Sequence, residues 1–177
     1  MIKMNNSNLS HEKIKMNLDY KIDNNRFNAR VSSIIYNKDK TKILLFKMKD
    51  RDFYMLPGRR IEMNENSLSA VKREILEELG FDLEFTLCSI QENFLKLKNT
   101  NIMQYCFCYK AIYDGKINDE KFVCKDNNSQ VFEWIDLNKL SNIISKPSST
   151  CKLIQDDRND IKHIIEFQVK RNVGRRK

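Results

Sequence analysis

Residues 102–113 form a predicted strand whose two faces are both largely apolar. One face carries mainly aromatic side chains, and the other carries two cysteines and two isoleucines together with Gln104 and Lys110. A strand of this kind is stable where other elements cover both of its faces. The segment therefore predicts a sheet that lies between helices, with residues 102–113 in a central position.

Shorter apolar runs on either side of this segment predict the remaining strands. Glycine and proline are scarce, at four and two residues, so each one that occurs is an informative turn signal. We expect an edge strand within 18–27 that turns at Asn24 and Asn25. The other predicted strands are 30–36, 42–47, 53–56, 83–94 and 131–135.

Apolar residues at helical spacing predict two helices. The first spans 67–79, is followed by Gly80 as a C-terminal cap, and carries on one face Leu68, Val71, Ile75 and Leu79. The second is expected to close the chain, with an apolar face made of Ile154, Ile161, Ile164 and Ile165. Strands that precede, flank and follow helices without regular alternation predict the α/β (α+β) class, with a mixed sheet between helices.

The length of 177 residues and the hydrophobic content of 41% fit one domain with its own core. We expect a flexible N-terminal segment at 1–16, a single domain at 17–169 and a basic tail at 170–177. The bland interpretation of the tail is a solvated terminus, and the alternative is an arm that contacts nucleic acid. An apolar edge among the first strands could pair with a second copy, which would give a homodimer.

Composition also indicates where the chain works. The first residues have no apolar stretch of the kind a signal peptide needs, and no segment is apolar enough to cross a membrane, so we expect a cytoplasmic protein. Five irregularly spaced cysteines fit free thiols, and no zinc site is expected. The net charge of +8 suits a phosphorylated small molecule as well as a polynucleotide.

The predicted helix at 67–79 carries three glutamates on one side near its C-terminal end, namely Glu74, Glu77 and Glu78. Like charges at this spacing repel, and carboxylates oppose the helix dipole there, at a cost of a few tenths of a kcal/mol for each effect. Mg²⁺ or Mn²⁺ would reverse the sign, because hard cations bind oxygen ligands and draw carboxylates together. The alternative interpretation is a solvated acidic face.

The surrounding residues decide between these interpretations, because residues 59–81 resemble the Nudix box. The matching positions are Glu65, Arg73-Glu74, Ile75, Glu77-Glu78 and Gly80-Phe81. Arg59 stands where the family has its opening glycine. Flanking strands, Leu56-Pro57-Gly58 and the segment around Trp134 extend the resemblance over about 26–145. The resemblance implies a Nudix-like α/β/α sandwich.

The resemblance implies Mg²⁺- or Mn²⁺-dependent hydrolysis of a pyrophosphate bond in a nucleoside diphosphate linked to another group. Candidate substrates are a nucleoside triphosphate, a nucleotide sugar or a dinucleotide. Glu74 and Glu78 would be the principal metal ligands, and Glu77 a further ligand or the general base. Glu65 and Arg73 would support them as a pair. Bases outside the box are also conceivable at Glu92, Asp119, Glu120 and Asp126.

Arg59 leaves alternatives open. Its backbone carbonyl could still bind the metal, although a turn that demands positive φ would cost about 1–2 kcal/mol for a residue other than glycine. Instead, Arg59 and Arg60 could direct their guanidinium groups toward substrate phosphates. Candidates for stacking on a nucleobase are Tyr54, Phe94, Tyr105 and Phe107, although aromatic residues that alternate along strands more often belong to the core.

Two further functions compete with the small-molecule hydrolase. The first is a catalytically weak Nudix-like module that binds or senses a nucleotide, with Arg59 as the residue that spoils the loop. The second is a pyrophosphohydrolase that acts on RNA 5′ ends, which the net charge of +8 and the basic tail suggest.

Overall fold

The computed structural model describes residues 16–124, 127–156 and 160–168. The predicted N-terminal segment, apart from Met16, the basic tail at 170–177 and the candidate base Asp126 lie outside the described residues. The division into segment, domain and tail stays a prediction. Within the described part of the chain, no helix is long and apolar enough to cross a membrane.

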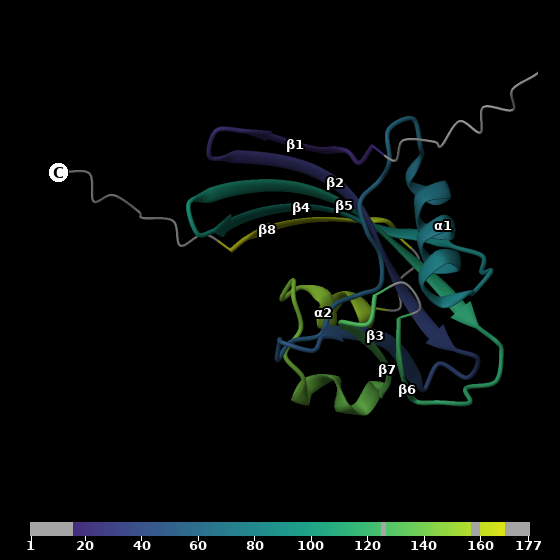
Figure 1. Ribbon diagram of the computed structural model, residues 1–177. Coiled ribbons are helices and arrows are strands. Elements are labelled where there is room, and N and C mark those ends of the chain that lie inside the picture. The colour runs from purple at the N-terminus through teal and green to yellow at the C-terminus, as the bar shows by residue number, and fades with distance from the viewer. Residues whose placement is uncertain (1–15, 125–126, 157–159, 169–177) are drawn as a thin grey trace, which may run out of the picture.

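Eight strands of the described chain form one sheet, and the described chain also contains one longer helix and two short helical segments (Figure 1). The strands are β1 (Asp19–Ile22), β2 (Asn25–Asn37), β3 (Lys42–Met48), β4 (Thr86–Leu97), β5 (Thr100–Tyr113), β6 (Lys121–Val123), β7 (Gln130–Asp136) and β8 (Lys162–Phe167). The helices are α1 (Ser67–Leu79), the 3₁₀ helix η1 (Leu137–Asn142) and α2 (Thr150–Ile154).

The sheet is mixed, as the sequence predicted. Its order is β6-β7-β3-β2-β5-β4-β8, and β1 pairs with the first half of β2 outside this path. The pairs β2–β5 and β4–β8 are parallel, whereas the other neighbours are antiparallel. Strand β5 lies between β2 and β4, so the central position predicted for residues 102–113 is confirmed.

Strands β2 and β3 separate soon after they meet, and this opening creates room for the candidate site. They pair only at Ile35–Leu44 and Tyr36–Ile43. Beyond this point the segment that leads to α1 lies between them, bridging to β3 at Met55 and to β2 at Arg60. The strand predicted at 53–56 is therefore wrong, because isolated bridges replace a continuous strand there.

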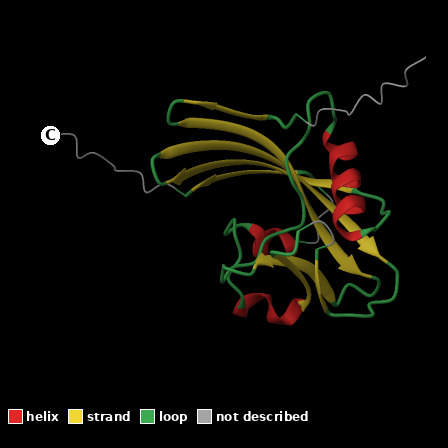
Figure 2. Cartoon of the chain, in the orientation of Figure 1, coloured by secondary structure: helices red, strands yellow, loops and turns green. Residues whose placement is uncertain are grey.

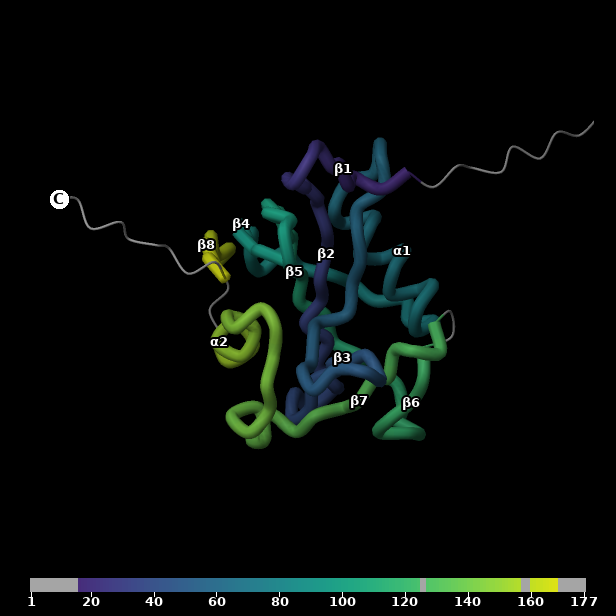
Figure 3. Tube along the Cα trace, turned by 60° about the vertical axis from the view of Figure 1, so that its left-hand side comes forward, coloured from purple at the N-terminus to yellow at the C-terminus, as the bar shows by residue number. Residues whose placement is uncertain are grey.

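Helices cover both faces of the sheet around this opening. Figure 3 shows α1 and α2 on opposite sides of β2 and β3. Alternate side chains of β2 follow the same division: Val31 and Ile35 belong to the apolar cluster with α1, and Ile34 and Tyr36 to the cluster with α2. The α/β/α sandwich implied by the resemblance is confirmed in this part of the molecule.

The helix predicted to close the chain is wrong. Ile154 ends the short helix α2, and Ile164 and Ile165 lie in β8, which pairs in parallel with β4. Figure 2 shows the last described segment of the chain as a strand. Ile164 is half-buried and Ile165 is exposed, as expected for alternating strand positions. Strand β6 lies in a segment for which the sequence predicted no strand.

Helix α1 begins and ends where the sequence predicted. Asn66 accepts a hydrogen bond from Ser69 N–H at 2.8 Å, and Gly80 closes the helix with φ of 75° while its N–H bonds to Leu76. Leu68 is exposed, which differs from the predicted apolar face. All five cysteines are free thiols, as expected.

Candidate active site

The loop before α1 is fixed to β2 by a glycine that no larger residue could replace without movement. Gly58 has φ of 136°, and a Cβ atom there would lie 2.3 Å from the carbonyl oxygen of Val31. Arg30 donates a hydrogen bond to the Gly58 carbonyl at 2.8 Å. The required glycine is thus Gly58, immediately before the position where the Nudix box has its own.

Arg59 itself carries no backbone strain. Positive φ at non-glycine positions of the described chain occurs at Asp23, Lys40, Asn64 and Lys98. The Arg59 carbonyl accepts a hydrogen bond from Val31 N–H at 2.8 Å, so it is part of the contact between loop and sheet. The proposed role of this carbonyl as a metal ligand stays a prediction, and it would use the second lone pair of the oxygen.

Two of the three glutamates of α1 lie on the face of the helix that meets the sheet. The side chains of Glu74 and Glu78 are 6% and 2% exposed, and they share this face with Val71 and Ile75. Glu77 is 34% exposed and lies toward the open side. The helical periodicity therefore carries two carboxylates into the interior together with the apolar residues.

Glu65 and Arg73 are joined as a pair. Nε and Nη2 of Arg73 donate to the two oxygens of Glu65 at 2.8 and 2.9 Å, which is a bidentate arrangement. Glu65 also accepts a hydrogen bond from Glu62 N–H at 3.0 Å. Nη1 of Arg73 reaches Glu74 at 2.6 Å and lies 3.5 Å from Glu77. One guanidinium thus holds the loop against the helix and orients the acidic cluster.

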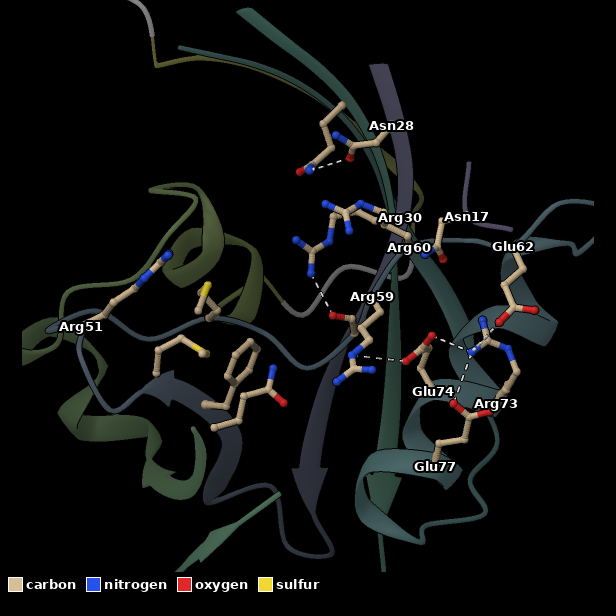
Figure 4. Close-up of a pocket in the computed structure, with 16 residues that line it drawn as sticks. Asn17, Asn28, Arg30, Arg51, Arg59, Arg60, Glu62, Arg73, Glu74 and Glu77 are labelled. Carbon is tan, nitrogen blue, oxygen red and sulfur yellow. Dashed lines mark hydrogen bonds and ion pairs between the residues drawn. The ribbon is translucent and has the colours of Figure 1, made fainter. Parts of the chain in front are cut away.

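The Arg59 side chain points at the buried carboxylates. Its Nε lies 2.9 Å from Oε1 of Glu78 and 3.8 Å from Oε2 of Glu74. Figure 4 shows the contact between Arg59 and Glu74. The sequence left open whether the Arg59 carbonyl would bind the metal or the Arg59 guanidinium would turn toward substrate phosphates. In the structure it supplies positive charge between two carboxylates of the box.

Burial and ion pairing pull the site's pKa values in different directions. Burial raises the pKa of Glu74 above its usual range, against the opposing influence of Arg73 and Arg59. The pKa of Arg73 is raised, first by its hydrogen bonds to Glu65 and further by Glu74. The acidic cluster therefore needs nearby positive charge to remain ionised.

No group of three or more Asp, Glu, His or Cys side chains in the described chain is arranged to hold a metal ion as it stands. The donor chemistry nevertheless fits a hard divalent cation, because Glu74 and Glu78 offer carboxylate oxygens to one point. Oε2 of Glu74 is buried and has no hydrogen-bond partner among the residues that the structure describes, which is unusual for a buried carboxylate oxygen. A cation between these side chains would provide that partner.

An open cleft of about 480 Å³ runs from this cluster to β3. In Figure 4, Glu74 and Glu77 lie at one end of the cleft, Arg59, Arg30 and Arg60 near its middle, and Arg51 at the other end. The remaining wall combines polar and apolar side chains, among them Asn28, Phe46, Met48, Met55, Gln104 and Gln130. The cleft thus joins a basic region to a partly apolar end.

Several residues singled out from the sequence lie elsewhere. Tyr54 is not part of the cleft wall: its hydroxyl donates to Glu133 at 3.0 Å, and burial raises its pKa to about 12. Glu92 pairs with His163, and Glu120 pairs with Lys42. The other aromatic candidates pack against apolar or aromatic neighbours, namely Phe94 on Phe167, Tyr105 on Phe27, and Phe107 against the core.

The cleft also contains residues that sequence reasoning missed. Arg30, Arg51 and Gln130 lie far apart along the chain and meet only through the sheet and the opening between β2 and β3. Arg30 falls within a predicted strand, and Arg51 and Gln130 fall in polar segments. No local pattern distinguishes them from ordinary surface residues.

A model of the NUDIX domain matches residues 26–155, which is most of the chain and includes the loop, α1 and the cleft. The chain belongs to the Nudix family. The family predicted from the box is confirmed, and the match supports the prediction of a Nudix-type enzyme.

This Nudix chain resembles two curated proteins that act on RNA. It is 27% identical to the m7GpppN-mRNA hydrolase of Saccharomyces cerevisiae over 127 residues, which is 68% of this chain and 12% of that protein. It is 38% identical to the RNA pyrophosphohydrolase of Ruthia magnifica subsp. Calyptogena magnifica over 63 residues, which is 36% of this chain and 35% of that protein. The Nudix chain therefore spans only a small part of either relative.

Solved structures share the fold of this Nudix chain. The mutator MutT protein from Bacillus halodurans matches with a TM-score of 0.61 and 17% identity, over 80% of this chain and 91% of that one. The dihydroneopterin triphosphate pyrophosphohydrolase of E. coli matches with a TM-score of 0.57 and 16% identity, over 71% and 91% of the two chains. At these identities the likeness supports the arrangement of sheet and helices.

Proposed function

We propose that this Nudix chain is a hydrolase that uses Mg²⁺ or Mn²⁺ to cleave a pyrophosphate bond in a nucleoside diphosphate derivative. The observation that carries the proposal is the convergence of Glu74 and Glu78, both buried, on one point at the end of an arginine-lined cleft. Buried carboxylates that share a site are costly unless a cation lies between them. A cleft that joins such a cation site to several guanidinium groups suits a pyrophosphate.

The residues of the cleft would divide the work by their chemistry. Glu74 and Glu78 would hold the cation, which when bound supplies charge neutralisation on the phosphates and eases deprotonation of water. Arg30 and Arg60 would bind phosphate oxygens, since planar guanidinium donors match them well. Glu77, the most accessible of the three acids, would accept the proton of the water that attacks phosphorus while the bridging P–O bond breaks.

The end of the cleft beside β3 would receive the less charged part of the substrate. Phe46, Met48 and Met55 offer an apolar surface there. Oε1 of Gln130 is buried, lines the same cleft and has no hydrogen-bond partner within the described residues. An acceptor beside an apolar wall fits a nucleobase that stacks and donates one hydrogen bond.

The test is chromatographic separation of the cleavage products, including free phosphate and pyrophosphate where a substrate releases them, from a panel of substrates with Mg²⁺, Mn²⁺ or EDTA. The panel contains nucleoside triphosphates, nucleotide sugars, dinucleotides, and RNA with either a triphosphate or a capped 5′ end. Glu77→Gln is expected to lower turnover at least about 100-fold, because it removes a general base. Glu84→Gln removes a carboxylate that pairs with Lys72 at an exposed position, and it serves as the matched control.

RNA 5′ ends are the second candidate substrate, and two observations favour them. Both curated relatives described above act on RNA according to their names, and the net charge of this chain is +8. If RNA is the substrate, KM should rise steeply with salt concentration, because phosphate contacts release counterions. A KM that is insensitive to salt would leave a small nucleotide as the substrate.

The panel also distinguishes an enzyme from a sensor. Metal-dependent turnover that is lost in Glu77→Gln and kept in Glu84→Gln would support the hydrolase. Nucleotide binding without turnover on any member of the panel would contradict it and favour the catalytically weak binding module.

A further inference from the structure

The side chain of Arg59 occupies the point on which the two buried carboxylates converge. Its Nε is within 3.8 Å of oxygens from both Glu74 and Glu78. Of the two carboxylate side chains, neither is more than 6% exposed, whereas the Arg59 side chain is 42% exposed. The carboxylates are therefore fixed in the interior, and their cationic partner reaches them from the solvent side.

We propose that the Arg59 guanidinium is the counter-ion of Glu74 and Glu78 in the metal-free protein and that a divalent cation displaces it on binding. This inference rests on the proposed function, because it places the cation at the same carboxylates. Arg59 is then a competitor of the metal ion, and it lowers the affinity of the site for that ion.

Electrostatics require the exchange. A guanidinium and a divalent cation cannot both lie between the same two carboxylates, because they repel each other and compete for the same oxygen lone pairs. Without either cation, the two buried carboxylates would be left with less compensation than their burial demands. Arg59 fills this role without backbone strain, since its φ is not positive.

The cleft beside the two carboxylates can accommodate the Arg59 guanidinium after a metal ion displaces it. Arg59 lines the same cleft as Arg30 and Arg60, so its flexible side chain can leave the acids and remain in the cleft. There its planar donors would meet substrate phosphates. Binding of the cation would thus release a phosphate-binding group at the moment when the site becomes able to hold a phosphate.

The decisive measurement is the affinity of the full chain for Mn²⁺ without substrate. The electron paramagnetic resonance signal of free Mn²⁺ reports how much of the ion is bound. We expect Arg59→Gln to bind Mn²⁺ about tenfold more tightly than the wild type, since removal of a competitor frees the carboxylates; tenfold corresponds to about 1.4 kcal/mol. An arginine with a purely structural role would have the opposite effect, because its loss would loosen the site and weaken binding.

Arg60→Gln is a closely matched control. The Arg60 side chain is 41% exposed, lines the same cleft and forms an ion pair with Asp19 at 2.7 Å rather than with the acidic helix. The substitution removes the same charge, so a general electrostatic effect would appear in both variants. We expect the Mn²⁺ affinity of Arg60→Gln to stay close to that of the wild type.

Thermal unfolding provides a second readout. In EDTA, Arg59→Gln should melt below the wild type, and saturating Mn²⁺ should raise its Tm by more than it raises that of the wild type. Arg59→Met repeats the test with an apolar side chain. A neutral variant that folds only when Mn²⁺ is present would also support the proposal, because it shows that the acids need one of the two cations.

Unchanged or weaker Mn²⁺ binding in Arg59→Gln and Arg59→Met would overturn the exchange while leaving the proposed hydrolase intact. Tight binding that survives in Glu78→Gln would overturn it as well, because the ion would then lie elsewhere. Absence of Mn²⁺ binding in every variant, the wild type included, would overturn both the exchange and the metal-dependent function.

Discussion

Asp19 shows how a single residue outside the Nudix box can shape the cleft. Nε of Arg26 donates to Asp19 at 2.6 Å, and Arg60 forms an ion pair with the same carboxylate at 2.7 Å. The hydrogen bond from Arg26, aided by the charges of both arginines, lowers the pKa of Asp19 below its usual value of 3.8. Asp19 thereby ties the edge strand β1 to the loop that carries Arg59 and Arg60.

This linkage predicts a pH-dependent contribution to stability. A carboxylate with a lowered pKa in the folded state stabilises the protein above the unfolded pKa and loses that effect as pH falls through the folded pKa. Asp19→Asn should therefore lower the free energy of unfolding by about 1 kcal/mol at pH 7. The difference from the wild type should shrink as pH falls below 3.8.

The measurement is thermal unfolding by circular dichroism between pH 7 and pH 3. Asp52→Asn, at an exposed position in the 51–53 segment, removes the same charge as a control. A stability difference for Asp19→Asn that is equal at every pH would contradict the role given to its ionised form.

At this scale, the sequence predicted that Glu65 and Arg73 would pair, because both belong to one local motif. The catalytic and metal-binding roles given to these residues and to the acids of α1 stay predictions. The sequence could not predict where the Arg59 side chain points. That direction depends on the path of the loop across β2, which Gly58 and Arg30 set through long-range contacts. The cleft arginines escaped prediction for the same reason.

At the scale of elements, the loop between β3 and α1 tolerates little change of sequence at Gly58. Its approach to β2 at Gly58 leaves no room for a Cβ atom, and the φ of 136° is one that only glycine adopts readily. Gly58→Ala should cost at least about 2 kcal/mol of stability, through strain and displacement of the loop.

Differential scanning fluorimetry of Gly58→Ala tests this expectation, with Gly115→Ala as the control. A Cβ atom at Gly115 would meet the far end of the Tyr113 side chain, which can move more easily than backbone. Comparable losses of Tm in the two variants would contradict a special requirement at Gly58.

The element that sequence reasoning misassigned is the last strand. Ile161, Ile164 and Ile165 match helical spacing, yet the run Lys162–Phe167 is short and rich in β-branched residues. Periodicity alone cannot distinguish a helix from a strand over so few residues. The open edge of β4 decides the outcome, because it offers hydrogen bonds to a parallel partner.

For the molecule as a whole, the sheet extends well beyond its helices. Figure 1 shows β1, β2, β5, β4 and β8 running out past α1 and α2. Exposed apolar side chains gather on this part, including Tyr20, Ile22 and Phe27 near one edge. The mixed sheet was predictable from the order of strands and helices, whereas the uncovered extension depends on strand lengths that the sequence underestimated for β2.

The homodimer expected from the sequence stays a prediction, and this edge gives it a test. We expect light scattering after size exclusion to give a mass twice the 21.1 kDa of one chain. Ile22→Lys, which places a charge on the exposed edge strand β1, should shift the mass to that of one chain. A single-chain mass for the wild type would contradict the dimer.

The ion pairs of Arg59 have a consequence for the folding of the newly synthesised protein. Helix α1 can dock on the sheet with both of its interior acids already facing a positive charge from the same polypeptide. If Arg59 exchanges with the metal ion as proposed, a newly synthesised chain reaches its folded form without magnesium or manganese. During metal starvation the protein would then persist as an intact, silent reserve, ready to work when the ions return.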